Sequence, residues 1–117
     1  MHEMSIVTSL LSIVREEMSR HNVSKLLVVR VRYGVLTNIV PEAMTFAFEA
    51  LTAGTDLEGA RLETEEIPLI LRCAACDKEF STTDRSVFRA SCPFCGCNEG
   101  HVPMNGRELY LQHLEAE

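Results

Sequence analysis

The sequence predicts a mixed α+β fold: two helices on a three-stranded sheet, with a four-cysteine module inserted before the last strand. Two observations support this prediction. Apolar residues follow the spacing of two amphipathic helices, and three other segments carry strand patterns. All five cysteines fall between Cys73 and Cys97, a stretch that has little periodic apolar pattern. Such a stretch has too little apolar surface to fold without a bound metal ion.

We expect the first helix from Glu3 to Arg20, because its apolar residues recur on one helical face and Asn22 is a plausible stop. The second helix should begin at Pro41, because the first turn of a helix tolerates proline, and Gly54 should end it. The two apolar stripes are Val7, Leu10, Leu11, Val14 and Met18 in the first helix, and Met44, Ala47, Phe48 and Leu51 in the second.

Three segments are expected to be strands. Lys25 to Tyr33 is rich in valine and leucine, and Arg61 to Leu71 forms a second strand in which Pro68 indicates an edge or a kink. Glu108 to Leu114 alternates enough to form the third. If the first two strands pair in parallel, their crossover is right-handed, but the sequence does not reveal the strand order.

The composition divides the chain into two predicted domains. Residues 1–72 and 101–117 form an α/β domain, and residues 73–100 form the cysteine module. The net charge of -6 argues against nucleic-acid binding, which requires clustered Lys and Arg. The apolar run Ile6 to Val14 is interrupted by polar residues. We therefore expect neither a signal peptide nor a membrane span there. We therefore expect a cytoplasmic protein, in which cysteines act more often as metal ligands than as disulfides.

The cysteines have the spacing of a zinc ribbon. Cys73 and Cys76 form one C-x2-C pair, and Cys92 and Cys95 form another, fifteen residues later. Each short loop lets two thiolates converge on one ion, and two loops complete a tetrahedron. Pro93 presets a turn and Gly96 lets the backbone fold back. Because four protein ligands leave no open position, the zinc should be structural rather than catalytic.

Several alternatives remain for this module. Four thiolates also suit iron, as in rubredoxin, whereas thioredoxin-like redox chemistry is disfavoured because neither pair follows a strand and opens a helix. Cys97 is either a spare thiol near the ion, a ligand that exchanges with Cys95, or a link to another metal site. His101, just after the ribbon, could approach a metal, but we expect a surface residue.

The chain opens with a second candidate metal site, Met1-His2-Glu3. The Met1 amine and the His2 amide close a five-membered chelate ring, and the His2 amide and Nδ1 close a six-membered one. Deprotonated amide nitrogens are strong donors that favour square-planar Ni(II) or Cu(II). The fourth ligand is left open between the Glu3 amide, another side chain and water.

Taken together, these features resemble the HypA/HybF family of nickel metallochaperones, over essentially the whole chain. The resemblance lies in the amino-terminal Met-His-Glu-Met-Ser, the two C-x2-C pairs with the Arg72-Cys73 entry, Pro41-Glu42-Ala43 before Phe46-Ala47-Phe48-Glu49, and Gly106-Arg107-Glu108-Leu109. It implies nickel on His2 and Glu3, and structural zinc on the four cysteines. Cys97 is not part of the family pattern.

The resemblance also implies partners. They are a HypB-type nickel GTPase and the large-subunit precursor of [NiFe]-hydrogenase, with urease as a further client in some organisms; we expect a monomer or weak homodimer. The competing interpretations are a zinc-ribbon interaction or nucleic-acid-associated module, and a rubredoxin-like electron carrier. The sequence has no Ser/His/Asp spacing, no phosphate-binding loop and no three-ligand zinc pattern, so we expect no enzyme.

Overall fold

The structure, a computed structural model, describes residues 2–82 and 90–117, and of His2 it describes the backbone only. Two compact units make up the chain. The first comprises the residues up to Arg32 together with Ile39–Glu65 and Tyr110–Glu117, and the second comprises Tyr33–Asn38 and Glu66–Leu109. Whether the predicted domains, 1–72 with 101–117 and 73–100, act as separate metal-binding domains stays a prediction.

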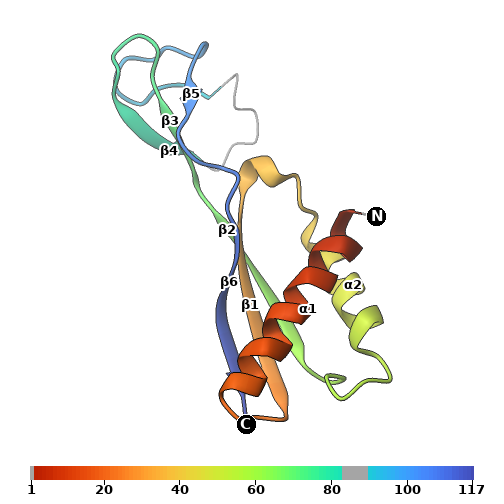
Figure 1. The fold of residues 1–117 in the computed structure, drawn as a ribbon. Helices are drawn as coiled ribbons and strands as arrows, with labels where there is room; N and C mark the ends of the chain where they lie inside the picture. Colours follow the sequence, from red (N-terminus) through yellow and green to blue (C-terminus); the bar gives the residue numbers. More distant parts are fainter. Residues whose placement is uncertain (1, 83–89) are drawn as a thin grey trace. The chain divides into compact units, whose positions relative to one another are not determined.

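The first unit contains two helices and a three-stranded sheet, in the strand order β2-β1-β6. Figure 1 shows both helices on the same face of this sheet, which confirms the predicted fold class. The helices and strands agree with the predicted segments to within a few residues, except at Pro68. They are α1 (His2–Arg20), β1 (Leu26–Gly34), α2 (Pro41–Thr52), β2 (Arg61–Ile67) and β6 (Leu109–Ala116).

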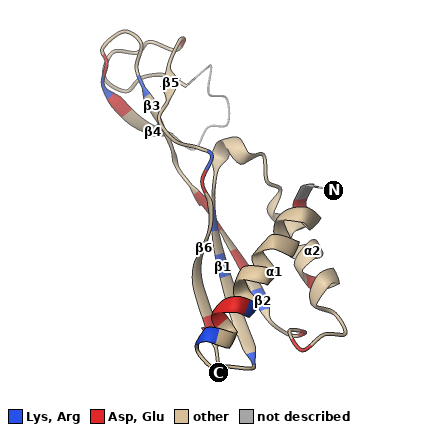
Figure 2. Ribbon diagram, viewed as in Figure 1, with Lys and Arg blue, Asp and Glu red and all other residues tan. Residues whose placement is uncertain are grey.

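The strand directions follow from hydrogen bonds and ion pairs. Lys25 and Glu117 exchange two backbone hydrogen bonds of 2.8 Å at one end of β1, as antiparallel neighbours do. Arg30 pairs with Glu63, and Arg32 pairs with Glu65, so the partners advance in the same direction along β1 and β2. β1 and β2 are therefore parallel, with α2 in the crossover between them. Figure 2 marks Lys and Arg in blue and Asp and Glu in red along the ribbon of this sheet.

The core of the first unit is aliphatic, as the absence of tryptophan predicts. Both amphipathic stripes are turned inward, because burying their apolar side chains removes them from water. No helix in the described ranges is long and apolar enough to cross a membrane. The buried side chains of this core include Val7, Leu10, Val14 and Met18 of α1, Val29 and Val31 of β1, Met44, Ala47 and Phe48 of α2, and Ile39 and Leu57.

The second unit has its own sheet, in which β3 (Leu69–Arg72) lies between β4 (Glu79–Thr82) and β5 (Val102–Pro103) and is antiparallel to both. The prediction of one strand over Arg61–Leu71 is therefore wrong at Pro68. Proline has no N–H to donate to a ladder, so the first sheet ends there and the next residues pair elsewhere.

The strand β3 gives the second unit an apolar core that the sequence did not predict for it. Leu69 and Leu71 are fully buried, and Phe80 of β4 packs with them. The short 3-10 helix η1 (Val35–Thr37) contributes Val35 to the same cluster. Hydrophobic burial therefore adds to metal binding in stabilising the fold of this unit. The remaining buried members are Cys73, Ala90 and Cys92.

The side chain of Asn105 repairs the hydrogen bonding around Pro68. Its Oδ1 accepts the Ile70 N–H at 2.8 Å, and its Nδ2 donates to the Pro68 carbonyl at 3.1 Å. The same Nδ2 also donates to the Glu108 carboxylate at 3.0 Å. The side chain of Asn105 thus supplies the hydrogen bonds that a neighbouring strand would supply beside Pro68 and Ile70.

Replacing Asn105 by alanine should therefore destabilise the second unit. The Ile70 N–H and the Pro68 carbonyl lose their partners, and we expect the free energy of unfolding to fall by about 1–3 kcal/mol. Denaturant unfolding of the zinc-loaded protein measures this change. Asn98→Ala, the same substitution at an exposed position, is the matched control and should change stability little. Equal stability of the two variants would contradict the assigned role of Asn105.

Candidate metal centre

The second unit brings the four predicted zinc ligands together. The sulfur atoms of Cys73, Cys76, Cys92 and Cys95 all lie within 4.8 Å of one another. Cys73 directly follows β3 and is buried together with Cys92, whereas Cys95 is exposed. The cluster is therefore anchored in the core on one side and open to solvent on the other.

Both C-x2-C loops use the same backbone hydrogen bonds. In the first loop, Cys73 N–H donates to the Lys78 carbonyl at 2.9 Å, and Asp77 N–H donates to the Cys73 carbonyl at 3.0 Å. In the second, Cys92 N–H donates to the Cys97 carbonyl at 2.8 Å, and Gly96 N–H donates to the Cys92 carbonyl at 2.8 Å. Residue 75 in one loop and residue 94 in the other donate an N–H to the first sulfur at 3.4 Å. The two loops are equivalent knuckles, and Cys97 occupies the position of Lys78.

This repeat requires a left-handed residue four positions after the first cysteine of each knuckle. Gly96 has φ +79° and Asp77 has φ +63°. Glycine adopts this conformation without steric cost, and Asp is among the few other residues that tolerate it. The expected role of Gly96 is confirmed, while the strained position of Asp77 was missed. Aligning the two C-x2-C pairs in the sequence would have revealed it.

The spacing of the sulfur atoms fits one zinc ion. A tetrahedral ion with Zn–S bonds of about 2.3 Å holds its sulfurs about 3.8 Å apart. The Cys73 and Cys95 sulfurs are 3.4 Å apart, and those of Cys76 and Cys92 are 3.6 Å apart. Four thiolates in this arrangement form a closed metal site whose donors suit zinc.

The four thiols hold their protons with unequal strength. Hydrogen bonding from the Cys76 backbone is the main cause that lowers the pKa of Cys73 to about 6, against the effect of burial. For Cys95, the Cys97 backbone acts to lower the pKa, but the neighbouring thiol of Cys73, burial and the other thiols outweigh it and raise the pKa to about 12. For Cys76, hydrogen bonding from the Lys78 backbone acts to lower the pKa, but burial and the thiols of Cys73 and Cys92 outweigh it and raise the pKa. A bound cation must displace these protons.

Two further side chains approach the cluster. The Cys97 sulfur and a His101 ring nitrogen lie within 4.8 Å of each other and of the Cys73 sulfur. The expectation that His101 is a surface residue is wrong, because its side chain is buried, with 6% of its surface exposed. The ring packs edge-on against Phe80, with the centroids 5.2 Å apart.

The predicted nickel ligands are only partly described. Met1 and the side chain of His2 lie outside the described residues, while Glu3 is half-buried in the first turn of α1. The two candidate metal sites belong to different units, since residues 2–20 are in the first and all four cysteines are in the second.

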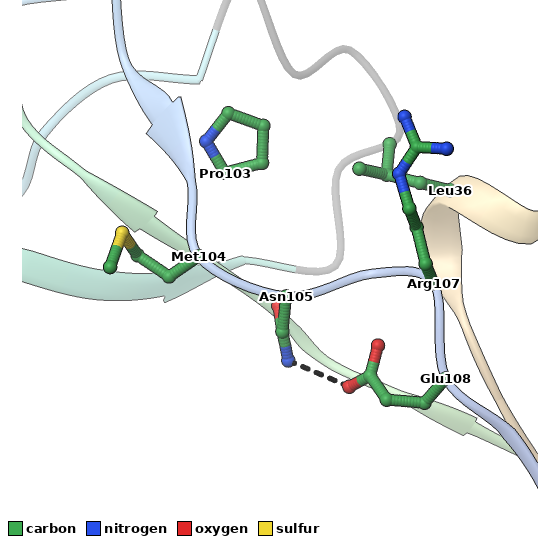
Figure 3. A pocket seen from close by; sticks show the side chains of 6 residues that line it. All are labelled: Leu36, Pro103, Met104, Asn105, Arg107 and Glu108. Carbon is green, nitrogen blue, oxygen red and sulfur yellow. Dashed lines mark hydrogen bonds between the residues drawn. The ribbon is translucent and has the colours of Figure 1, made fainter.

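The second unit also has an open hollow beside β5, shown in Figure 3. Asn105 and Glu108 meet in it through their hydrogen bond, and Leu36 lies across from them. No cysteine lines the hollow, so it is separate from the metal cluster. The other lining residues are Pro103, Met104 and Arg107.

Comparisons with known proteins agree with this architecture. Residues 1–116 match the model of a protein family described as HypA, hydrogenase/urease nickel incorporation, metallochaperone. The chain is 52% identical over 118 residues to the hydrogenase maturation factor HypA of Lawsonia intracellularis, with 100% of each chain covered. It is 47% identical over 117 residues to that of Solidesulfovibrio magneticus, again with 100% of each chain covered.

Solved structures show a similar fold. The solution structure of the Ni metallochaperone HypA from Helicobacter pylori matches with a TM-score of 0.63 and 23% identity, covering 97% of this chain and 96% of that one. A second solution structure, of a HypA protein, matches with a TM-score of 0.67 and 24% identity, covering 100% of this chain and 97% of that one. At these identities the likeness shows the fold alone.

Zinc binding should weaken steeply in acid. The raised pKa values of Cys76 and Cys95 mean that at least two thiols are protonated at pH 7, and zinc must displace both protons. The apparent affinity should therefore fall about a hundredfold between pH 7 and pH 6, and more steeply below pH 6, where Cys73 also binds a proton. Competition with a chromogenic chelator at several pH values measures this slope. A change below tenfold per unit would contradict the assigned protonation states.

The left-handed position of the second knuckle gives a separate test. A Cβ on Gly96 would meet no atom within 4 Å, so Gly96→Ala adds backbone strain without a clash. We expect it to lower the free energy of unfolding of the zinc-loaded protein by about 1–2 kcal/mol. Asp77→Gly, at the equivalent position, should change it by less than about 1 kcal/mol, because relief of strain offsets the greater freedom of the unfolded chain. Equal unfolding free energies for Gly96→Ala and the unsubstituted protein would show that this position bears no strain.

Proposed function

We propose, from the premise that this chain belongs to the HypA family of hydrogenase maturation nickel metallochaperones, that it holds the nickel it transfers at its amino terminus. The ligands are the Met1 amine and the backbone and side chains of His2 and Glu3. With a HypB-type GTPase, the protein delivers Ni(II) to the large-subunit precursor of [NiFe]-hydrogenase, and urease is a second possible client. Nickel is cargo here, and the protein is a non-catalytic carrier.

One observation carries this proposal: α1 begins at His2. The first four N–H groups of a helix have no acceptor within the helix. The amides of His2 and Glu3 are therefore not needed for the hydrogen bonds of α1. They can lose their protons and bind a metal ion without breaking the helix.

The same position makes the site reversible. The amino-terminal end of a helix carries partial positive charge and disfavours a bare cation. Nickel is bound there only when deprotonated amides and the Glu3 carboxylate offset that charge. Strong amide donors favour planar Ni(II) over ions such as zinc, and returning protons to the amides releases the ion.

The zinc centre has the opposite character. Four thiolates fill the coordination of the ion, so zinc there holds the second unit in its folded form. In this proposal residues 73–100 are the zinc domain, supported by β3 and β5 of the second unit, and residues 1–72 with 101–117 are the nickel domain. The two ions would thus be bound by different kinds of ligand, nitrogen donors for nickel and thiolates for zinc.

The proposed partners rest on the family. Membership of the HypA family implies partners in hydrogenase maturation, and the HypB-type GTPase is the one that would control release of the ion. We propose that the carrier acts in the cytoplasm as a monomer or weak homodimer. Figure 2 shows Lys and Arg interspersed with Asp and Glu along the described part of the ribbon, and the net charge of -6 argues against binding to nucleic acid.

Nickel binding should depend on the free amino terminus. We expect one Ni(II) per chain in untagged protein, and no stoichiometric binding after His2→Ala or after two residues are added before Met1. The added residues remove the amine from the chelate but leave α1 intact. Isothermal titration with Ni(II), together with the d–d absorption band of planar nickel, measures this.

The controls separate the two metals. His113→Ala, on the exposed side of β6, should leave nickel binding unchanged, and zinc should stay at one per chain in all variants. Nickel binding that survives the extension would move the site elsewhere in the chain. A nickel-transfer assay to hydrogenase precursor, with and without the GTPase and GTP, then tests delivery.

A further inference from the structure

His101 is a buried polar residue whose ring nitrogens both contact backbone. Its Nε2 lies 2.9 Å from the Cys97 carbonyl oxygen, and the Ala74 N–H donates to its Nδ1 at 3.4 Å. Ala74 belongs to the first knuckle and Cys97 to the end of the second. The imidazole ring therefore spans the two halves of the metal cluster.

These contacts determine the form of the ring. A carbonyl oxygen can only accept, so Nε2 must carry a hydrogen and donate it to Cys97. Nδ1 accepts from Ala74, so it carries none. His101 is thus the neutral Nε2–H tautomer, and the lone pair of Nδ1 is engaged by a backbone N–H. The ring is close enough to the sulfurs to be considered a ligand, but both of its nitrogens are already committed.

The Cys97 carbonyl is a shared acceptor. It also accepts the Cys92 N–H at 2.8 Å, the bond that closes the second knuckle. In the first knuckle, the equivalent carbonyl belongs to Lys78. His101 thus adds to the second knuckle a hydrogen bond that connects it directly to the first.

The chain holds His101 in place from both sides. Gly100, immediately before it, has φ +76°, a conformation that glycine adopts freely. Val102, immediately after it, begins β5 and pairs with Arg72 of β3, next to Cys73. The edge-on contact with Phe80, at an interplanar angle of 85°, limits rotation of the ring.

We propose that His101 is a positioning residue of the zinc centre: as a neutral imidazole it joins the backbones of the two knuckles and presets the distance between their cysteine pairs. It acts on the metal through the ligands, as hydrogen-bonding partners outside a coordination sphere do elsewhere. It does not bind the metal itself. Cys97 contributes its carbonyl to this arrangement, and its thiol is not required.

The test compares two substitutions. His101→Leu fills the apolar space beside Phe80 but removes both hydrogen bonds, and zinc affinity should fall about 10–100-fold. His101→Gln keeps one donor and one acceptor at a similar separation and should recover most of the affinity. His113→Leu, an exposed histidine on β6, is the matched control and should bind zinc normally. Zinc affinity is measured by competition with a chelator.

Two spectroscopic measurements separate positioning from ligation. With Co(II) in place of zinc, the four-thiolate absorption spectrum should be the same for the unsubstituted protein, His101→Leu and His101→Gln. In the unsubstituted zinc protein, ¹⁵N NMR of the imidazole should show a protonated Nε2 and an unprotonated Nδ1 that is not metal-bound.

Three results would overturn the proposal. They are unchanged zinc affinity in His101→Leu, a cobalt spectrum of the unsubstituted protein that shows a nitrogen ligand, or the opposite imidazole tautomer. If His101→Leu does not fold, His101→Gln and the tautomer still test the proposal. A zinc affinity of His101→Gln about 10–100-fold below that of the unsubstituted protein would reject the proposal, and so would an imidazole ring protonated at Nδ1.

Discussion

The second unit depends on holding four sulfur atoms within reach of one ion. Four partly ionised thiols repel one another, and the raised pKa values of Cys76 and Cys95 show that these two resist ionisation, so the arrangement needs support from outside the sulfurs. Two knuckles with the same backbone hydrogen bonds supply that support, and β3 with its buried leucines fixes the first knuckle to a small apolar core. A metal ion then removes the repulsion and completes the structure. Metal binding and folding are therefore coupled in this unit.

The first unit is built differently, and the difference matters for its use. Its two helices bury aliphatic stripes against a sheet, so its stability comes from hydrophobic burial and needs no ion. The nickel site proposed at the beginning of α1 would therefore gain or lose its ion without unfolding the first unit. A carrier requires this independence. If release of the ion unfolded the protein, the protein could not deliver the ion and be reused.

The sequence predicted the features that depend on periodicity and spacing. It did not predict those that depend on contacts of a single side chain with a distant part of the backbone. Both helices, the three-stranded sheet and the cysteine cluster follow from apolar spacing and the paired C-x2-C pattern. The sequence indicated an edge or a kink at Pro68 but not the second sheet that follows it, because Asn105, far along the chain, completes the ladder there. The burial of His101 was missed for the same reason. A histidine after a ribbon looks solvated until β5 is known to pair next to Cys73.

A protein that holds two metals must prevent either from occupying the wrong site. Nickel binds nitrogen donors well, and zinc binds well to four thiolates in a tetrahedron. The coordination geometry of each site therefore discriminates between the two ions better than the strength of binding does. A cluster preset by His101 near tetrahedral sulfur spacing disfavours planar nickel before any ligand has to be exchanged. The proposed amino-terminal chelate of amide nitrogens would impose a square-planar geometry, which nickel favours and zinc does not. On this argument the rigidity of the zinc centre serves nickel transfer as well as folding, because a looser cage would compete for the cargo.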